Sequence, residues 1–314
     1  SFTSLISMYP TLLLYGIHLI TLLGVYVLAR RCFSQHKYRE AIAVIALVFA
    51  GVLYGLDSPQ MKYIIGGVVG NTLGNSFIVA IILSFFVGLA EKRRAIAALG
   101  IVLVVALAYT HHLSTLLLAF SLAGIGVTLV VFRFRYALSR AVHILLSRHV
   151  LGAAVIGAIL FFFVWTPAYI RNSAVKSVVG ESDVVKEEHM GIALGDYIFA
   201  LGDIRTVLGL VGVALLVVWL VRTRKELSTS STSRSLGAVT LVGWLWPLWL
   251  LVFAPSWIGI DIPTIRTANY TILPMAIAGA FAAVWVLTLV LRQRLANGIG
   301  TGFAVLFVVA MLTP

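Results

Sequence analysis

The chain has 314 residues, of which 61% are hydrophobic and 11% are charged, and its formal net charge is +12. A soluble domain averages about 25% charged residues, so the composition excludes an ordinary soluble protein. The basic residues flank apolar runs, as they do beside membrane helices, and therefore do not indicate a nucleic-acid partner.

Apolar runs recur along the whole chain. Many approach the roughly 20 residues that a bilayer-spanning helix needs, and none shows the alternation of a membrane β-barrel strand. We therefore predict an all-α fold, a polytopic transmembrane bundle of about ten spans forming a single domain over residues 1–314. The predicted spans are 5–29, 41–55, 64–90, 95–110, 114–132, 151–167, 207–221, 236–253, 271–291 and 299–313.

Basic residues alternate between the connectors. Five connectors (30–40, 91–94, 133–149, 222–235 and 291–298) hold 17 of the 23 Lys and Arg residues. Basic connectors stay on the cytoplasmic side, so this set is predicted to be cytoplasmic and the protein to lie in the plasma membrane. The first span then runs from outside to inside. Because no initiator Met or signal peptide precedes it, we expect an upstream span and loop to be absent from this chain.

Two outer connectors are long, 168–206 and 254–270. Loops of this length are usually functional or disordered, so we expect the chemistry at the extracytoplasmic face. Arg266 lies in the second loop, and its guanidinium matches a phosphate group. The alternative is an interfacial arginine that extends to headgroups or pairs with Asp261. The other candidate phosphate-binding residues in the outer connectors are Lys62, Tyr63, Asn269 and Tyr270.

A glycine-rich stretch, GGVVGNTLGNSF, opens the third span at residues 66–77. Asn71 or Asn75 could cap the helix, and the outward helix N-terminus suits an anion. The alternative is close helix packing through small residues.

Acidic candidates lie in the same outer connectors. Glu187, Glu188 and His189 are consecutive and could bind a divalent cation or supply a base, although a solvated loop face is the alternative. Together with Asp57, the two glutamates are weak candidates for a catalytic carboxylate.

Two adjacent histidines, His111 and His112, stand between two predicted spans. Ionisable residues at a membrane tend to mark a site. Consecutive helical residues point about 100° apart, so both can face one pocket only in a tight turn. We predict phosphate contact for both, or metal binding by His111 with His189. Interfacial hydrogen bonding is the alternative, and His111 is expected to face the cavity.

Four segments together carry a resemblance: LLGVYVLARRCF, YGLDSPQMKYIIGGVVGNTL, YTHHLSTLLLAFSLAG and IPTIRTANYTILPMAIAGA. Over roughly residues 5–290, this pattern of spans resembles the GT-C superfamily of polytopic glycosyltransferases that use polyprenyl- or dolichyl-phosphate sugars. The resemblance implies an inverting transferase that acts on a lipid-phosphate donor at the outer face. In that family the catalytic Asp or Glu typically sits in the first outer loop, which is expected upstream of this chain, so the catalytic residue is unassigned.

Two other classes remain open. A transporter or flippase of lipid-linked substrates should carry charges in the middle of its spans, and His18 is the one candidate. A structural subunit should pack its outer loops on partner subunits. The expected partners are membrane lipid and the lipid-linked donor.

Overall fold

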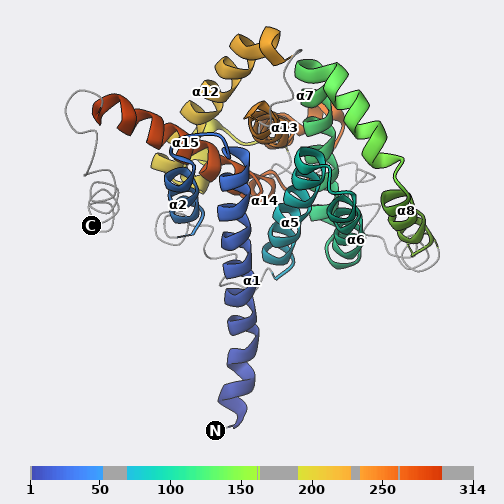
Figure 1. The fold of residues 1–314 in the computed structure, drawn as a ribbon. Coiled ribbons are helices and arrows are strands. Elements are labelled where there is room, and N and C mark those ends of the chain that lie inside the picture. Colours follow the sequence, from blue (N-terminus) through green and yellow to red (C-terminus); the bar gives the residue numbers. More distant parts are fainter. Residues whose placement is uncertain are drawn as a thin grey trace.

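The computed structural model describes residues 2–51, 69–160, 162, 190–227, 234–260 and 262–291. Within these ranges every regular element is a helix, which confirms the all-α prediction (Figure 1). The helices are α1 (Phe2–Cys32), α2 (Arg39–Ala50), α5 (Val69–Glu91), α6 (Arg94–Thr110), α7 (His112–Leu145), α8 (Arg148–Leu160), α11 (Leu194–Leu201), α12 (Asp203–Leu227), α13 (Arg234–Phe253), the 3-10 helix η3 (Pro255–Ile258), α14 (Thr264–Asn269) and α15 (Ile272–Leu291).

Five of the described helices are long and apolar enough to cross a membrane. The candidate spans are Thr72–Glu91, His112–Phe132, Asp203–Arg222, Ser235–Phe253 and Ile272–Val290. Each agrees closely with a predicted apolar run. Two shorter apolar helices, α6 and α8, match further runs, whereas the full count of ten stays a prediction.

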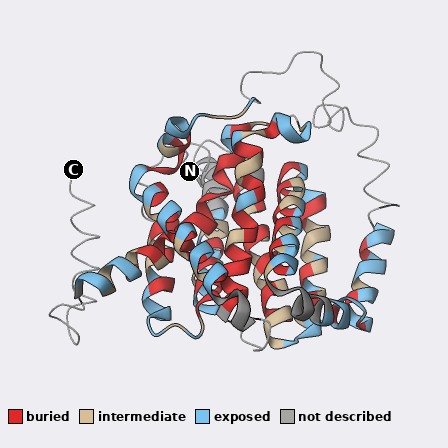
Figure 2. Ribbon diagram, turned by 90° about the horizontal axis from the view of Figure 1, so that it is seen from above, coloured by how far each residue is buried: buried red, intermediate tan, exposed pale blue. Residues whose placement is uncertain are grey.

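Helix surfaces outside the core are strongly apolar. Val155 on α8, Val221 on α12 and Val290 on α15 are between 58% and 68% exposed. Figure 2 shows the buried residues gathered along the inner faces of the central helices. Exposed apolar surface of this extent belongs in a lipid environment, which agrees with a membrane protein.

Small residues let the central helices approach closely. A Cβ on Gly212 of α12 would lie 1.9 Å from the carbonyl oxygen of Ala278 on α15, and one on Gly124 of α7 would lie 2.3 Å from that of Gly243 on α13. Backbone contact of this kind is typical of helix packing in membranes. It brings the α7–α13 and α12–α15 pairs, distant in sequence, side by side.

The basic connectors meet at one end of the bundle. Arg31 at the end of α1 forms an ion pair with Glu91 at the end of α5, and Arg94 contacts His143 of α7. Arg222 of α12 lines a pocket together with Gln35 of the α1–α2 turn. Four of the five connectors predicted to be cytoplasmic therefore lie together. One connector is more regular than expected, since α7 continues to Leu145; the segment 133–145 contains no Gly or Pro to end the helix.

The described parts of the long outer connectors fold onto the opposite end. Residues 190–206 include α11 and the first turn of α12, and the Ile192 N–H donates to the carbonyl of Val252 (3.1 Å). Residues 254–270 form η3 and α14, and α14 packs against both α11 and α13. These connectors therefore place ordered side chains beside the ends of α5, α6, α7 and α15.

Candidate functional site

His111 joins α6 to α7 and caps α7. Its backbone is extended (φ −157°, ψ 104°), and its Nδ1 accepts a hydrogen bond from the N–H of Ser114 at 3.2 Å. Nδ1 therefore carries no proton, and the neutral ring holds its proton on Nε2. The Ser114 hydroxyl lies 2.6 Å from the same Nδ1 and must donate to it.

Ser114 also forms a hydrogen bond with Tyr270. The Ser114 and Tyr270 hydroxyl oxygens are 2.6 Å apart, and both side chains are buried. Because the Ser114 proton points at Nδ1, the Tyr270 hydroxyl donates to the Ser114 oxygen. One hydrogen-bonded chain thus runs from Tyr270 through Ser114 to His111 and fixes the imidazole, with Nε2–H as its remaining donor.

Close packing of α5 against α7 holds this chain in place. A Cβ on Gly74 would lie 1.9 Å from the Ser114 Oγ and 3.4 Å from the Tyr270 hydroxyl. The glycine is therefore a packing residue, which supports the close-packing interpretation of the GGVVGNTLGNSF stretch at this position. Ser114 and His111 also have the spacing of a nucleophile and its base. Ser114 is 0% exposed, however, so substrate cannot reach it and its role is to position His111.

His111 is neutral at physiological pH. Burial, followed by the charges of His112 and Arg266, lowers the pKa of His111 to about 4. The positive charge of Arg266 therefore disfavours the protonated form of the ring. Arg266 itself is exposed on α14, whereas Thr267, Ala268 and Asn269 turn inward.

A second hydrogen-bonded chain anchors the junction of α14 and α15. The Trp249 indole N–H donates to the Tyr197 hydroxyl (2.9 Å), which donates to Thr271 Oγ1 (2.7 Å), and Thr271 donates to the carbonyl of Ala268 (2.7 Å). Burial raises the pKa of Tyr197 to about 12, so the phenol stays protonated. This network fixes the helix that carries Arg266.

Two asparagines with buried side-chain oxygens lie close in sequence to residues of this contact, since Asn75 follows Gly74 and Asn269 precedes Tyr270. The Oδ1 atoms of Asn75 and Asn269 have no hydrogen-bond partner among the described residues. Asn269 is 3% exposed. A buried acceptor of this kind is normally satisfied.

The structure brings together several of the predicted site residues. His111 and Tyr270 are joined through Ser114, Arg266 acts on His111, and Asn269 is buried next to Tyr270. His112 is exposed, with its ring centroid 5.8 Å from that of His111. The remaining candidates, Asp57, Lys62, Tyr63, Glu187, Glu188 and His189, lie outside the described residues, as does the side chain of Asn71.

Metal binding stays a prediction. In the described ranges, no three or more His, Cys, Asp or Glu side chains are grouped so that they could hold a metal ion. Since Ser114 occupies Nδ1, a metal at His111 would have to bind Nε2, and its predicted partner His189 is not described.

The sequence analysis did not identify Ser114 or Tyr197, whereas Gly74 lies in the glycine-rich stretch for which close packing was one interpretation. Ser114 has a signal in retrospect, because it stands three residues after the N-cap, where a side chain can reach the cap. The pairing of Ser114 with Tyr270 spans 156 residues and has none. Comparison with protein-family models, with curated proteins and with solved structures finds no match.

Proposed function

We propose that this end of the bundle binds the phosphate of a lipid-linked sugar, and that the protein is a membrane glycosyltransferase acting at the extracytoplasmic face of the plasma membrane. The observation that carries the proposal is the chain from Tyr270 through Ser114 to His111. It fixes a neutral imidazole whose Nε2–H has no hydrogen-bond partner among the described residues, and the exposed Arg266 guanidinium acts electrostatically on this ring.

The two groups complement each other toward a phosphate. Arg266 supplies a permanent positive charge and a rigid fork of N–H donors. His111 adds a neutral donor whose orientation is set before the ligand binds, which reduces the reorganisation needed as charge develops on a leaving phosphate.

Transfer also requires a base for the acceptor hydroxyl. The resemblance places that carboxylate in a first outer loop, and the candidates within this chain, Asp57, Glu187 and Glu188, are outside the described residues. The proposal therefore assigns phosphate binding to His111 and Arg266 and leaves the base unassigned.

The direct test uses the full chain in nanodiscs. Binding of a polyprenyl monophosphate and of the matching polyprenol is measured by native mass spectrometry, and transfer is followed as polyprenyl phosphate released from a panel of polyprenyl-phosphate sugars. We expect the phosphate to bind and Arg266→Ala to weaken its binding about tenfold or more, because a hydrogen bond to a charged group contributes about 1.5–3 kcal/mol.

Arg148→Ala is the matched control, since it removes one exposed positive charge at the basic end of the bundle. It should leave both readouts unchanged. Equal binding of polyprenol and polyprenyl phosphate, unaffected by Arg266→Ala, would contradict the phosphate site. Release of polyprenyl phosphate from one of the donors would support the transferase, whereas movement of the bound lipid across the bilayer without release would favour the transporter alternative.

A further inference from the structure

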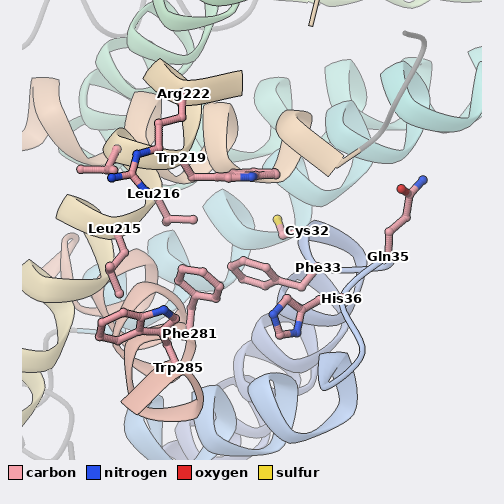
Figure 3. Close-up of a pocket in the computed structure, with 11 residues that line it drawn as sticks. Cys32, Phe33, Gln35, His36, Leu215, Leu216, Trp219, Arg222, Phe281 and Trp285 are labelled. Atoms are coloured by element: carbon pink, nitrogen blue, oxygen red, sulfur yellow. The ribbon is translucent and has the colours of Figure 1, made fainter. Parts of the chain in front are cut away.

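A second candidate site lies at the basic end of the bundle. A pocket of about 530 Å³ opens between the middle and later turns of α12 and α15 and the turn that follows α1 (Figure 3). Its volume falls within the roughly 300–1,000 Å³ of small-molecule sites. The outer site uses residues from the opposite ends of the helices, so the two are separate.

The walls of the pocket are mainly aromatic. Trp219 of α12 faces Phe281 and Trp285 of α15, as Figure 3 shows. Phe33 stacks on Phe281 with ring centroids 5.0 Å apart and planes 9° from parallel. The remaining apolar lining comes from Leu215, Leu216, Val218 and the buried Cys32. These walls suit a hydrocarbon chain.

Among the described residues that line the pocket, every charged group is positive. Arg222 is the cation, Gln35 and His36 are the other polar groups, and none of the described lining residues is acidic. Burial lowers the pKa of His36, so its ring is neutral. The Tyr38 N–H donates to His36 Nδ1 (3.2 Å), which leaves Nε2–H as the ring's donor. The polar lining therefore offers a positive charge and a neutral donor, and it favours an anion.

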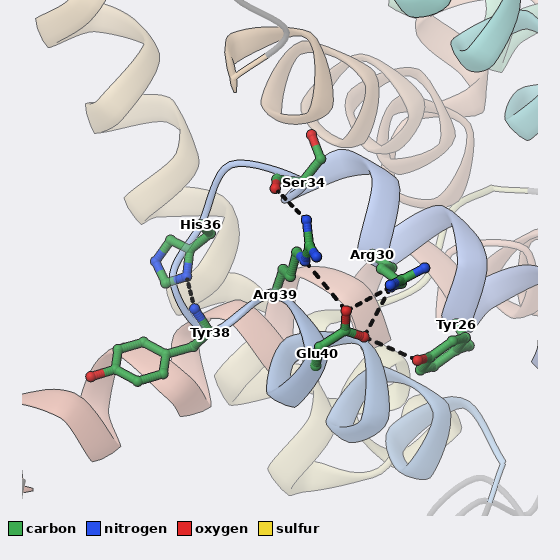
Figure 4. A network of polar contacts seen from close by, with 7 residues as sticks. All are labelled: Tyr26, Arg30, Ser34, His36, Tyr38, Arg39 and Glu40. Atoms are coloured by element: carbon green, nitrogen blue, oxygen red, sulfur yellow. Dashed lines mark hydrogen bonds and ion pairs between the residues drawn. The ribbon is translucent and has the colours of Figure 1, made fainter. Parts of the chain in front are cut away.

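Polar contacts between the end of α1 and the start of α2 hold the turn that carries Gln35 and His36 (Figure 4). Glu40 accepts hydrogen bonds from Arg30 (2.7 Å) and Tyr26 (3.1 Å) and forms an ion pair with Arg39 (3.3 Å). The hydrogen bond from Arg30 keeps the pKa of Glu40 below its usual range. The Glu40 carboxylate is thus ionised and is paired with Arg30 and Arg39 rather than with Arg222.

The pocket opens toward the lipid-facing surface. Val218 and Trp285, on two of its walls, are 45% and 41% exposed. Tryptophans of this kind are enriched at the level of lipid headgroups. The surrounding connectors are those that the charge distribution assigns to the cytoplasmic side, where anionic lipids concentrate.

We propose that this pocket binds an anionic phospholipid of the cytoplasmic leaflet, with an acyl chain between Trp219 and Trp285 and the headgroup phosphate on Arg222. An arginine fork matches a phosphate with two parallel hydrogen bonds. The site is independent of the proposed transfer reaction.

The test uses the full chain, delipidated in detergent and titrated with phosphatidylglycerol, phosphatidylcholine or inorganic phosphate by native mass spectrometry. Saturable binding of phosphatidylglycerol is expected, with weaker binding of phosphatidylcholine, whose quaternary ammonium leaves the headgroup without net negative charge. Arg222→Ala should weaken phosphatidylglycerol binding about tenfold or more. Leu215→Trp should abolish binding of both lipids, because the larger ring occupies the chain's volume.

Arg148→Ala is again the charge-matched control and should bind phosphatidylglycerol as the parent does. Thermal unfolding of each variant checks that it is folded, and Arg222→Lys provides a milder change that should retain part of the binding. Equal affinity for the two lipids with no effect of Arg222→Ala would overturn the proposal. Full displacement of phosphatidylglycerol by millimolar inorganic phosphate would also overturn it, since the site would then recognise the anion without the chain.

Discussion

Replacing Gly74 by Ala tests the packing that positions His111. The new Cβ would lie 1.9 Å from Ser114 Oγ and 2.7 Å from Ser114 Cβ, whereas an ordinary contact is about 3.5 Å. Helices α5 and α7 must therefore separate locally by about 1 Å or more. The 2.6 Å hydrogen bond from Tyr270 to Ser114 is then stretched beyond the roughly 3.0 Å limit of such bonds.

The expected magnitude follows from three opposing contributions. Overpacking a well-packed site costs about 1–3 kcal/mol, and loss of the hydrogen bond adds about 0.5–1.5 kcal/mol. Alanine is the better helix former by about 1 kcal/mol, which acts the other way. Gly74→Ala should therefore lower the free energy of unfolding by about 0.5–3.5 kcal/mol.

Reversible unfolding in mixed micelles, followed by tryptophan fluorescence, measures this change. Gly126→Ala on α7 is the matched control, because a Cβ there meets nothing within 4 Å; it should be neutral or slightly stabilising. Adding Ser114→Gly to Gly74→Ala should recover part of the loss by removing both clashing atoms. A Gly74→Ala protein at least as stable as the parent would refute the reasoning.

Two further predictions concern the same hydrogen-bonded chain. Ser114→Ala and Tyr270→Phe should each destabilise the protein, but the double variant should cost less than their sum, with a coupling of about 0.5–1.5 kcal/mol; strict additivity in a double-mutant cycle would argue against a direct bond. Because the pKa of His111 is about 4 in the folded protein and about 6.5 when unfolded, the unfolded state binds the extra proton between these values. Stability should therefore fall as the pH drops from 6.5 to 4 and gain nothing above 6.5, and His111→Asn, which keeps a good cap, should make unfolding less sensitive to pH in that window. An identical pH profile for the variant would show that His111 is not held neutral.

The candidate site was only partly predictable. The sequence predicts Arg266 because a guanidinium matches a phosphate, and His111 because ionisable residues at a membrane tend to mark a site; Asn269 and Tyr270 are polar residues of the same connector as Arg266. Ser114, which joins two of them, looks in the sequence like an ordinary hydroxyl on an apolar helix. The sequence does not predict the pocket lined by Arg222 and His36. Its other lining residues are mainly apolar and aromatic side chains of predicted spans, and such residues are common there.

The sequence by itself determined the helical membrane class and the gathering of basic connectors at one end. Both follow from hydropathy and charge, which add up residue by residue along the chain. Tertiary structure alone decided that Tyr270 reaches Ser114 and that Arg222 shares a pocket with His36. Such contacts depend on how closely particular helices approach, and at Gly74 that distance is set by a single missing Cβ. Side chains far apart in the chain acquire a common site only after the helices have packed.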